Sequence, residues 1–118
     1  MTFDQNGNIV VADTGSHRIQ VFQLDGAVIR NFGTKGVGDG EFRAPIGVAI
    51  DRNGNIIVVD EENHNIQIVK PHGTHVLKFG SEGEEDGELS SPVGAACGLD
   101  GRIFIADARK QPHSGFWT

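Results

Sequence analysis

The sequence predicts an all-β protein built from one repeated unit. Short segments rich in valine and isoleucine alternate with turns, and 17 of the 118 residues are glycine. The phrase FDQNGNIVVAD at 3–13 returns as IDRNGNIIVVD at 50–60 and as CGLDGRIFIAD at 97–107, so the unit repeats every 47 residues. No segment shows the periodicity of an amphipathic helix over about ten residues.

The unit at 45–91 can be followed strand by strand. A strand of small residues leads to Asn53-Gly54, a pair that favours a type I′ hairpin turn, in which both central residues have positive φ. The next segment, IIVVD, is apolar on both faces, as a strand packed between two neighbouring sheets must be. The expected strands are 46–51, 56–60, 66–70 and 75–79, and residues 81–91 cross to the next unit. Four antiparallel strands followed by a long connection describe one blade of a β-propeller.

The chain therefore has material for about two and a half blades. Residues 1–44 would form a blade that lacks its innermost strand, residues 45–91 a complete blade, and residues 92–118 a partial blade with a divergent tail. A partial propeller exposes strand edges and an apolar blade face, so we expect poor solubility or association through the open blades. We expect a fragment of a longer protein or a truncated or misassembled gene model, in which residues 108–118 could be foreign sequence.

Composition narrows the classes of function. The net charge is −6, which argues against a dedicated nucleic-acid binder. Cys97 is the sole cysteine, so the chain can form neither an internal disulfide nor a cysteine-based metal site, and a reducing, cytoplasmic location is expected. The N-terminus has no signal-peptide pattern, and no apolar run is long enough to span a membrane.

Two segments carry a resemblance to a known family. The runs VADTGSHRIQVF at 11–22 and VVDEENHNIQIV at 58–69 resemble the NHL repeat signature, and the resemblance extends over residues 1–107. The phrase FGSEGEEDGELSSPVG at 79–94 is most similar to the animal tripartite-motif (TRIM) NHL proteins. This resemblance implies a propeller of six blades that follows RING, B-box and coiled-coil segments in a ubiquitin ligase. It also implies a non-enzymatic segment that recognises protein or RNA, needs no cofactor and packs against the remaining blades.

The loops after the second and fourth strands of each blade should emerge on one face of the disc. Residues 61–65 and 81–91 hold seven carboxylates and no lysine or arginine, so they would repel phosphate and favour a protein partner with a basic or neutral patch. RNA binding through other blades and simple solvation of acidic loops remain open alternatives. The candidate partner-binding residues are His17, Arg18, Lys35, Arg43, Glu61, Glu62, His64, Glu84, Glu85 and Asp86.

Two sets of recurring residues have a structural and a chemical interpretation. Asp13, Asp60 and Asp107 end the second strand of each unit and are expected to accept hydrogen bonds from backbone N–H groups of the next loop. His17 and His64 also occupy equivalent positions, where a hydrogen bond to neighbouring backbone is the favoured interpretation. The alternative is a segment of an NHL-like propeller enzyme or a calcium- or zinc-dependent lyase, in which such histidines would bind metal.

Overall fold

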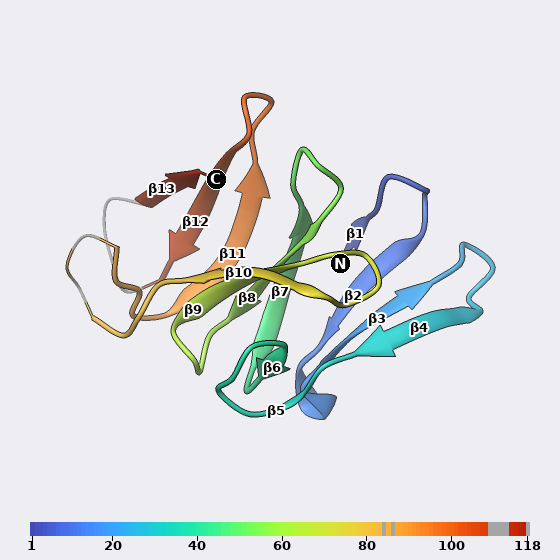
Figure 1. Cartoon of the computed structure of the whole chain (residues 1–118), viewed down its shortest axis with the longest axis horizontal. Helices are drawn as coiled ribbons and strands as arrows, with labels where there is room; N and C mark the ends of the chain where they lie inside the picture. Colours follow the sequence, from blue (N-terminus) through green and yellow to red (C-terminus); the bar gives the residue numbers. More distant parts are fainter. Residues whose placement is uncertain (84, 86, 109–113, 118) are drawn as a thin grey trace.

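Three antiparallel sheets stand side by side in the computed structural model, which describes residues 1–83, 85, 87–108 and 114–117 (Figure 1). The first sheet has the strand order β1-β2-β3-β4, the second β10-β9-β8-β7, and the third β11-β12-β13. The strands of the first sheet are β1 (Thr2–Phe3), β2 (Ile9–Asp13), β3 (Arg18–Phe22) and β4 (Val28–Phe32), with the short 3-10 helix η1 (Thr14–Ser16) after β2. Those of the second and third are β7 (Pro45–Ile50), β8 (Ile56–Asp60), β9 (Asn65–Val69), β10 (His75–Phe79), β11 (Pro92–Cys97), β12 (Arg102–Asp107) and β13 (Ser114–Trp117).

The repeat in the sequence is also a repeat in the structure. The bounds of β3 and β9, of β4 and β10, and of β7 and β11 each differ by 47 residues at both ends. The all-β architecture and the predicted 47-residue spacing are therefore confirmed for the described part of the chain.

The crossovers between sheets repeat as well. In the first crossover, β5 (Thr34–Lys35) runs parallel to β6 (Glu41–Phe42). In the second, Glu82 forms a parallel bridge with Leu89, and both residues lie 47 positions beyond Lys35 and Phe42, which pair in the first. Phe42 and Leu89 are fully buried, the first between sheets one and two and the second between sheets two and three. Each crossover therefore inserts one large apolar side chain into the interface that it spans.

The hairpin between β7 and β8 differs from the expected type I′ turn. Gly54 has a φ of 85°, but Asn53 is absent from the residues with positive φ. The N–H of Gly54 donates to the carbonyl of Asp51 and the N–H of Asp51 donates to the carbonyl of Asn55. This is a three-residue loop, a type I turn completed by a glycine bulge. The Asp51 carboxylate stabilises it by accepting from the N–H groups of Asn53 and Asn55 at 2.8 and 2.9 Å.

The two ends of the chain differ from the complete middle sheet. We expected the first blade to lack its innermost strand, and that position is held by β1, a strand of only two residues. We also expected the repeat to break down after Asp107, yet β13 pairs with β12 as a third strand. Ile103 lies opposite Phe116 in this pair, just as Ile56 lies opposite Val69 in the second sheet, 47 residues earlier.

The core consists of two layers, one on each face of the second sheet. In β8, Ile56 and Val58 point into the cluster shared with the first sheet, whereas Ile57 and Val59 point into the cluster shared with the third. Side chains along a strand alternate between faces, so a strand buried on both sides must be apolar throughout. All five residues of β8 are buried, which confirms that the second sheet lies between two neighbours.

Candidate partner-binding face

The aspartate at the end of the second strand anchors the crossover that precedes its own sheet. The Asp60 carboxylate is fully buried and accepts hydrogen bonds from the backbone N–H groups of Arg43 and Ala44, both at 2.9 Å. Asp107 does the same for the N–H groups of Ser90 and Ser91, which lie 47 residues further on. The structural interpretation of these two aspartates is confirmed, with the correction that most of the amides come from the preceding crossover rather than the next loop.

Asp13 departs from this pattern. Its carboxylate accepts from the side chains of Arg18 at 3.3 Å and Gln20 at 3.0 Å instead of backbone N–H groups. The corresponding glutamine of the second sheet, Gln67, is fully buried and bonds to the crossover, where it contacts the N–H of Gly40 and the carbonyl of Glu41. The first-sheet aspartate and glutamine therefore bond to each other rather than to a crossover.

Two loop histidines hold the same crossovers. Each belongs to the sheet that precedes its crossover. His17 and His64 have φ angles of 56° and 55°, the only positive φ values among the described residues other than glycine. Their Nδ1 atoms lie 2.7 Å from the carbonyl of Arg43 and 2.8 Å from the carbonyl of Ser90, respectively. A carbonyl only accepts, so Nδ1 of each ring carries the proton. The predicted bond from each loop histidine to backbone is confirmed.

These contacts create a hollow on the surface at the boundary between the second and third sheets. Its volume is about 410 Å³, and Arg43, Glu61, Glu62, His64, Ser90 and Ser91 line it. The Arg43 guanidinium lies 3.8 Å from the Glu62 carboxylate, and the side chains are 47% and 58% exposed. Ser91 Oγ donates to the Glu61 carboxylate at 2.9 Å, and His64 Nε2 lies 3.8 Å from Glu82. Polar groups that are fixed by backbone anchors but open to solvent suit the recognition of a polar or charged ligand.

The structure brings together part of the predicted face. Arg43, Glu61, Glu62 and His64 share the hollow, and His17 joins it through the Arg43 carbonyl. Figure 1 places η1 and the β5–β6 crossover at the same edge of the molecule, opposite the tight turns that join β7 to β8 and β11 to β12.

The other candidates do not line the hollow in the described part of the chain. Arg18, on β3, pairs with Asp13 at the end of β2, and Lys35 lies exposed on β5. Glu85 belongs to the second crossover, where its N–H donates to Glu88. Glu84 and Asp86 fall outside the described residues.

Two residues that line this hollow were not among the predicted ones, whereas Glu82 is one of the seven carboxylates expected in these loops. Ser90 and Ser91 line the hollow, and Glu82 faces His64. The repeat contained the signal for the serines, since they lie 47 residues after Arg43 and Ala44, the residues that precede the first strand of the second sheet. The charge pattern of the loops, in contrast, indicates only ionisable groups.

Two kinds of feature are absent from the described residues. No group of three or more histidine, cysteine, aspartate or glutamate side chains is arranged there to hold a metal ion. In the same part of the chain, no helix has the length and apolar character needed to cross a membrane.

Comparison with known proteins identifies the repeat and the fold. Residues 1–22 and 42–69 match the NHL repeat. The chain is a partial β-propeller with NHL repeats. Comparison with curated protein sequences gives no match.

Solved structures support this fold assignment. A Bacteroides thetaiotaomicron protein of unknown function is 20% identical with a TM-score of 0.75, and the alignment covers 87% of this chain but 30% of that protein. Virginiamycin B lyase from Staphylococcus aureus is 18% identical with a TM-score of 0.65, covering 98% of this chain and 39% of the lyase. A gluconolactonase from Xanthomonas campestris is 20% identical with a TM-score of 0.61, covering 86% and 31%. At these identities the likeness shows the fold alone.

Proposed function

We propose that this segment is a non-enzymatic recognition module, and that the hollow around His64 receives a cationic side chain of a protein partner. The lining contributes two carboxylates, Glu61 and Glu62, against one guanidinium, that of Arg43. Because Arg43 lies beside Glu62, its charge is already partly compensated within the face. The single observation that carries the proposal is this solvent-open hollow with an excess of carboxylates.

Charge favours a protein partner over RNA at this position. Glu82, Glu85 and Glu88 lie in the crossover beside the hollow and add to the negative potential. A phosphate brought to this surface would meet repulsion, whereas a lysine or arginine side chain would be attracted and could form charge-assisted hydrogen bonds. The rigid backbone under the hollow, held by Asp60 and His64, reduces the entropy that binding would cost.

We further propose that the segment belongs to the substrate-recognition propeller of a cytoplasmic TRIM-type ubiquitin ligase. The phrase at 79–94 supports this assignment through its likeness to TRIM proteins. In that case the ligase chemistry would belong to a RING domain outside this segment. The sequence of the complete parent protein tests the assignment: RING and B-box cysteine and histidine spacing upstream is expected, and a signal peptide with paired cysteines would instead favour a propeller enzyme.

Binding of a defined peptide tests the recognition site. The expected result is that a fluorescent lysine- and arginine-rich peptide binds the chain, and that Glu61→Gln combined with Glu62→Gln weakens binding about tenfold by fluorescence anisotropy. The matched control combines Asp25→Asn with Asp100→Asn, which removes the same charge from two hairpin turns and leaves the carboxamide oxygens to accept the turn hydrogen bonds. Equal weakening by both pairs would mean that net charge, and not the hollow, governs binding.

A further inference from the structure

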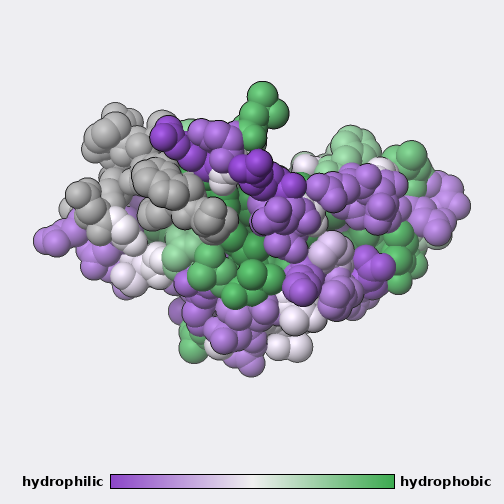
Figure 2. Space-filling view, turned by 45° about the horizontal axis from the view of Figure 1, so that its top comes forward, coloured by the Kyte–Doolittle hydropathy of each residue, from purple (hydrophilic) through white to green (hydrophobic). Residues whose placement is uncertain are grey.

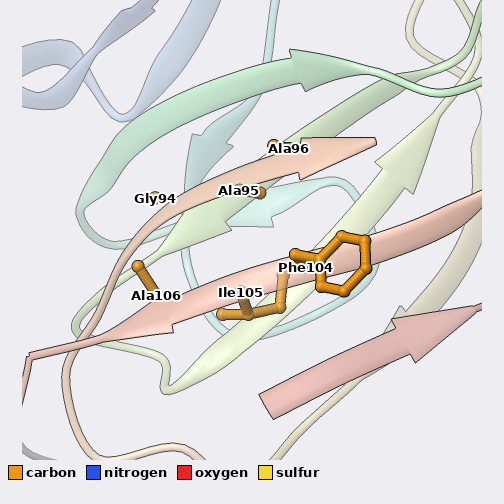
Figure 3. Close-up of a pocket in the computed structure, with 6 residues that line it drawn as sticks. All are labelled: Gly94, Ala95, Ala96, Phe104, Ile105 and Ala106. Atoms are coloured by element: carbon orange, nitrogen blue, oxygen red, sulfur yellow. The ribbon is translucent and has the colours of Figure 1, made fainter. Parts of the chain in front are cut away.

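The hollow at His64 differs from other parts of the surface in the hydrogen-bonding groups that it offers. Hydrophilic residues occupy much of the surface seen in Figure 2, so polarity alone does not mark a site. A second hollow of equal volume, about 410 Å³, lies on the third sheet, and its lining side chains carry no hydrogen-bonding atom (Figure 3). That lining consists of Gly94, Ala95, Ala96, Phe104, Ile105 and Ala106. Of the two, only the hollow at His64 has side-chain groups that can orient a polar ligand.

The ring of His64 contributes a hydrogen-bond acceptor. Its Nδ1 donates to the carbonyl of Ser90, so Nε2 of the neutral ring carries a lone pair rather than a proton. Nε2 lies 3.8 Å from the Glu82 carboxylate, which when ionised also only accepts. Two acceptors make no hydrogen bond with each other, whereas an N–H group of a ligand can donate to either. His64 and Glu82 would therefore both gain from a donor supplied by a ligand.

The two glutamates of the loop add further acceptors. Oε2 of Glu61 accepts from Ser91 Oγ at 2.9 Å, which fixes the carboxylate in place. Among the described residues, no donor bonds to the other oxygen of Glu61. Glu62 lies 3.8 Å from the Arg43 guanidinium, beyond the roughly 2.7–3.2 Å of a hydrogen bond. Because this guanidinium, the one cationic group of the lining, lies at Glu62, Glu61 and His64 keep acceptors for a ligand.

The repeat explains why this boundary has room for a ligand. Ser90 lies 47 residues after Arg43 and has the same backbone role, since each carbonyl accepts from the loop histidine of the preceding sheet. A short serine side chain therefore stands where the preceding crossover carries a long arginine side chain. The Ser90 hydroxyl donates to the carbonyl of Gly83 within its own crossover, at 2.9 Å. The hollow opens beside this serine.

We propose that the hollow at His64 selects arginine over lysine and receives the guanidinium group of an arginine side chain. The selection rests on the proposed function, because it specifies which cation of the protein partner is bound. A guanidinium presents five N–H donors in a planar fork, can form two parallel hydrogen bonds with one carboxylate, and is weakly hydrated. It can therefore donate to Glu61 and toward other acceptors at once. A lysine ammonium is a compact, strongly hydrated charge and gains mainly from electrostatic attraction.

Paired peptides test the selection with the full chain. Two fluorescent peptides of equal length and charge, one with lysine at every position where the other has arginine, are compared by fluorescence anisotropy. The measurement is made at about pH 8, where histidine side chains are ordinarily neutral. The arginine peptide should bind at least about tenfold more tightly. Equal affinities would overturn the selection and leave recognition of a cation intact, whereas binding of neither peptide would overturn both.

Two variants of the lining show whether the preference originates in the hollow. Glu61→Gln removes the carboxylate that can pair with a guanidinium, and Ser91→Ala removes the hydroxyl that holds Glu61 without changing the charge. Each should reduce the ratio of the two affinities to about threefold or less, with circular dichroism as the check on folding. The control Asp100→Asn removes a charge from a hairpin turn and should leave the ratio unchanged. A ratio that survives both lining variants, or that Asp100→Asn lowers equally, would overturn the proposal.

Discussion

Asp60 connects the second sheet to the crossover before it, and its substitution should be among the most damaging in the chain. The buried carboxylate accepts four hydrogen bonds: from the N–H groups of Arg43, Ala44 and Asn63, and from Asn63 Nδ2. Ala44 is only 6% exposed, so its N–H could not turn to water if the carboxylate were removed.

The expected cost follows from these contacts. A buried donor left without a partner costs about 1–3 kcal/mol, and Asp60→Ala leaves several donors without their acceptor, one of them the buried N–H of Ala44. We therefore expect Asp60→Ala to lower the free energy of unfolding by about 3–5 kcal/mol, a large fraction of the stability of a small domain. Asp60→Asn keeps one accepting oxygen and should lose about 2 kcal/mol.

Urea unfolding followed by circular dichroism, at one fixed protein concentration, measures this loss. The matched control is Asp13→Ala, because the Asp13 side chain is 28% exposed and accepts only from the side chains of Arg18 and Gln20, for an expected cost of about 1 kcal/mol. Hydrogen exchange should also show loss of protection at the N–H groups of Arg43 and Ala44. Equal costs at Asp60 and Asp13, or unchanged protection, would refute the anchoring role.

Three further predictions concern the packing and the turns. Phe42→Ala and Leu89→Ala should each lower the free energy of unfolding by about 3 kcal/mol in the same assay, because each leaves a cavity between two sheets. Gly7→Ala should cost about 1–2 kcal/mol, since Gly7 has a φ of 80°, whereas Gly15→Ala should be nearly neutral by thermal melting. His64→Ala should cost about 1–2 kcal/mol through its lost bond to the crossover, and an unchanged melting temperature would contradict this.

Much of the fold could be predicted because the repeat fixes the strands. Once the apolar run at 56–60 is assigned to a strand, the repeat predicts strands 47 residues earlier and later, where β2 and β12 lie. The turn at Asn53-Gly54 was predicted incorrectly because the dipeptide alone favours a two-residue loop. Asp51, two residues before Asn53, accepts hydrogen bonds from two N–H groups of the turn and thereby stabilises a three-residue loop.

In the third sheet, the structural repeat extends further along the chain than the sequence repeat does. The residues of β13 share no signature with β3 or β9, but the strand pairs with β12 in the register that the repeat demands. Strand pairing is made by backbone groups, which every non-proline residue carries, so the side-chain pattern can diverge while the pairing persists.

The candidate face could be predicted only in outline. Arg43 was grouped with the first blade by its position in the chain, but it lies beside Glu62 of the second. Contacts across a boundary between sheets depend on how the crossover folds back, and the sequence gives no distance between a crossover and the following loop. The acidic character of the loops was apparent from composition, whereas the hollow that their backbone creates was not.

Competition between a protein-like and an RNA ligand tests the central claim most directly. The measurement is fluorescence anisotropy of the full chain with a lysine- and arginine-rich peptide and with a single-stranded RNA of equal length, at low ionic strength. We predict that the peptide binds and that added salt lowers its affinity. Glu61→Gln combined with Glu62→Gln should abolish most of this binding, and the RNA should show no comparable affinity. RNA binding tighter than peptide binding, and unaffected by these substitutions, would contradict the account.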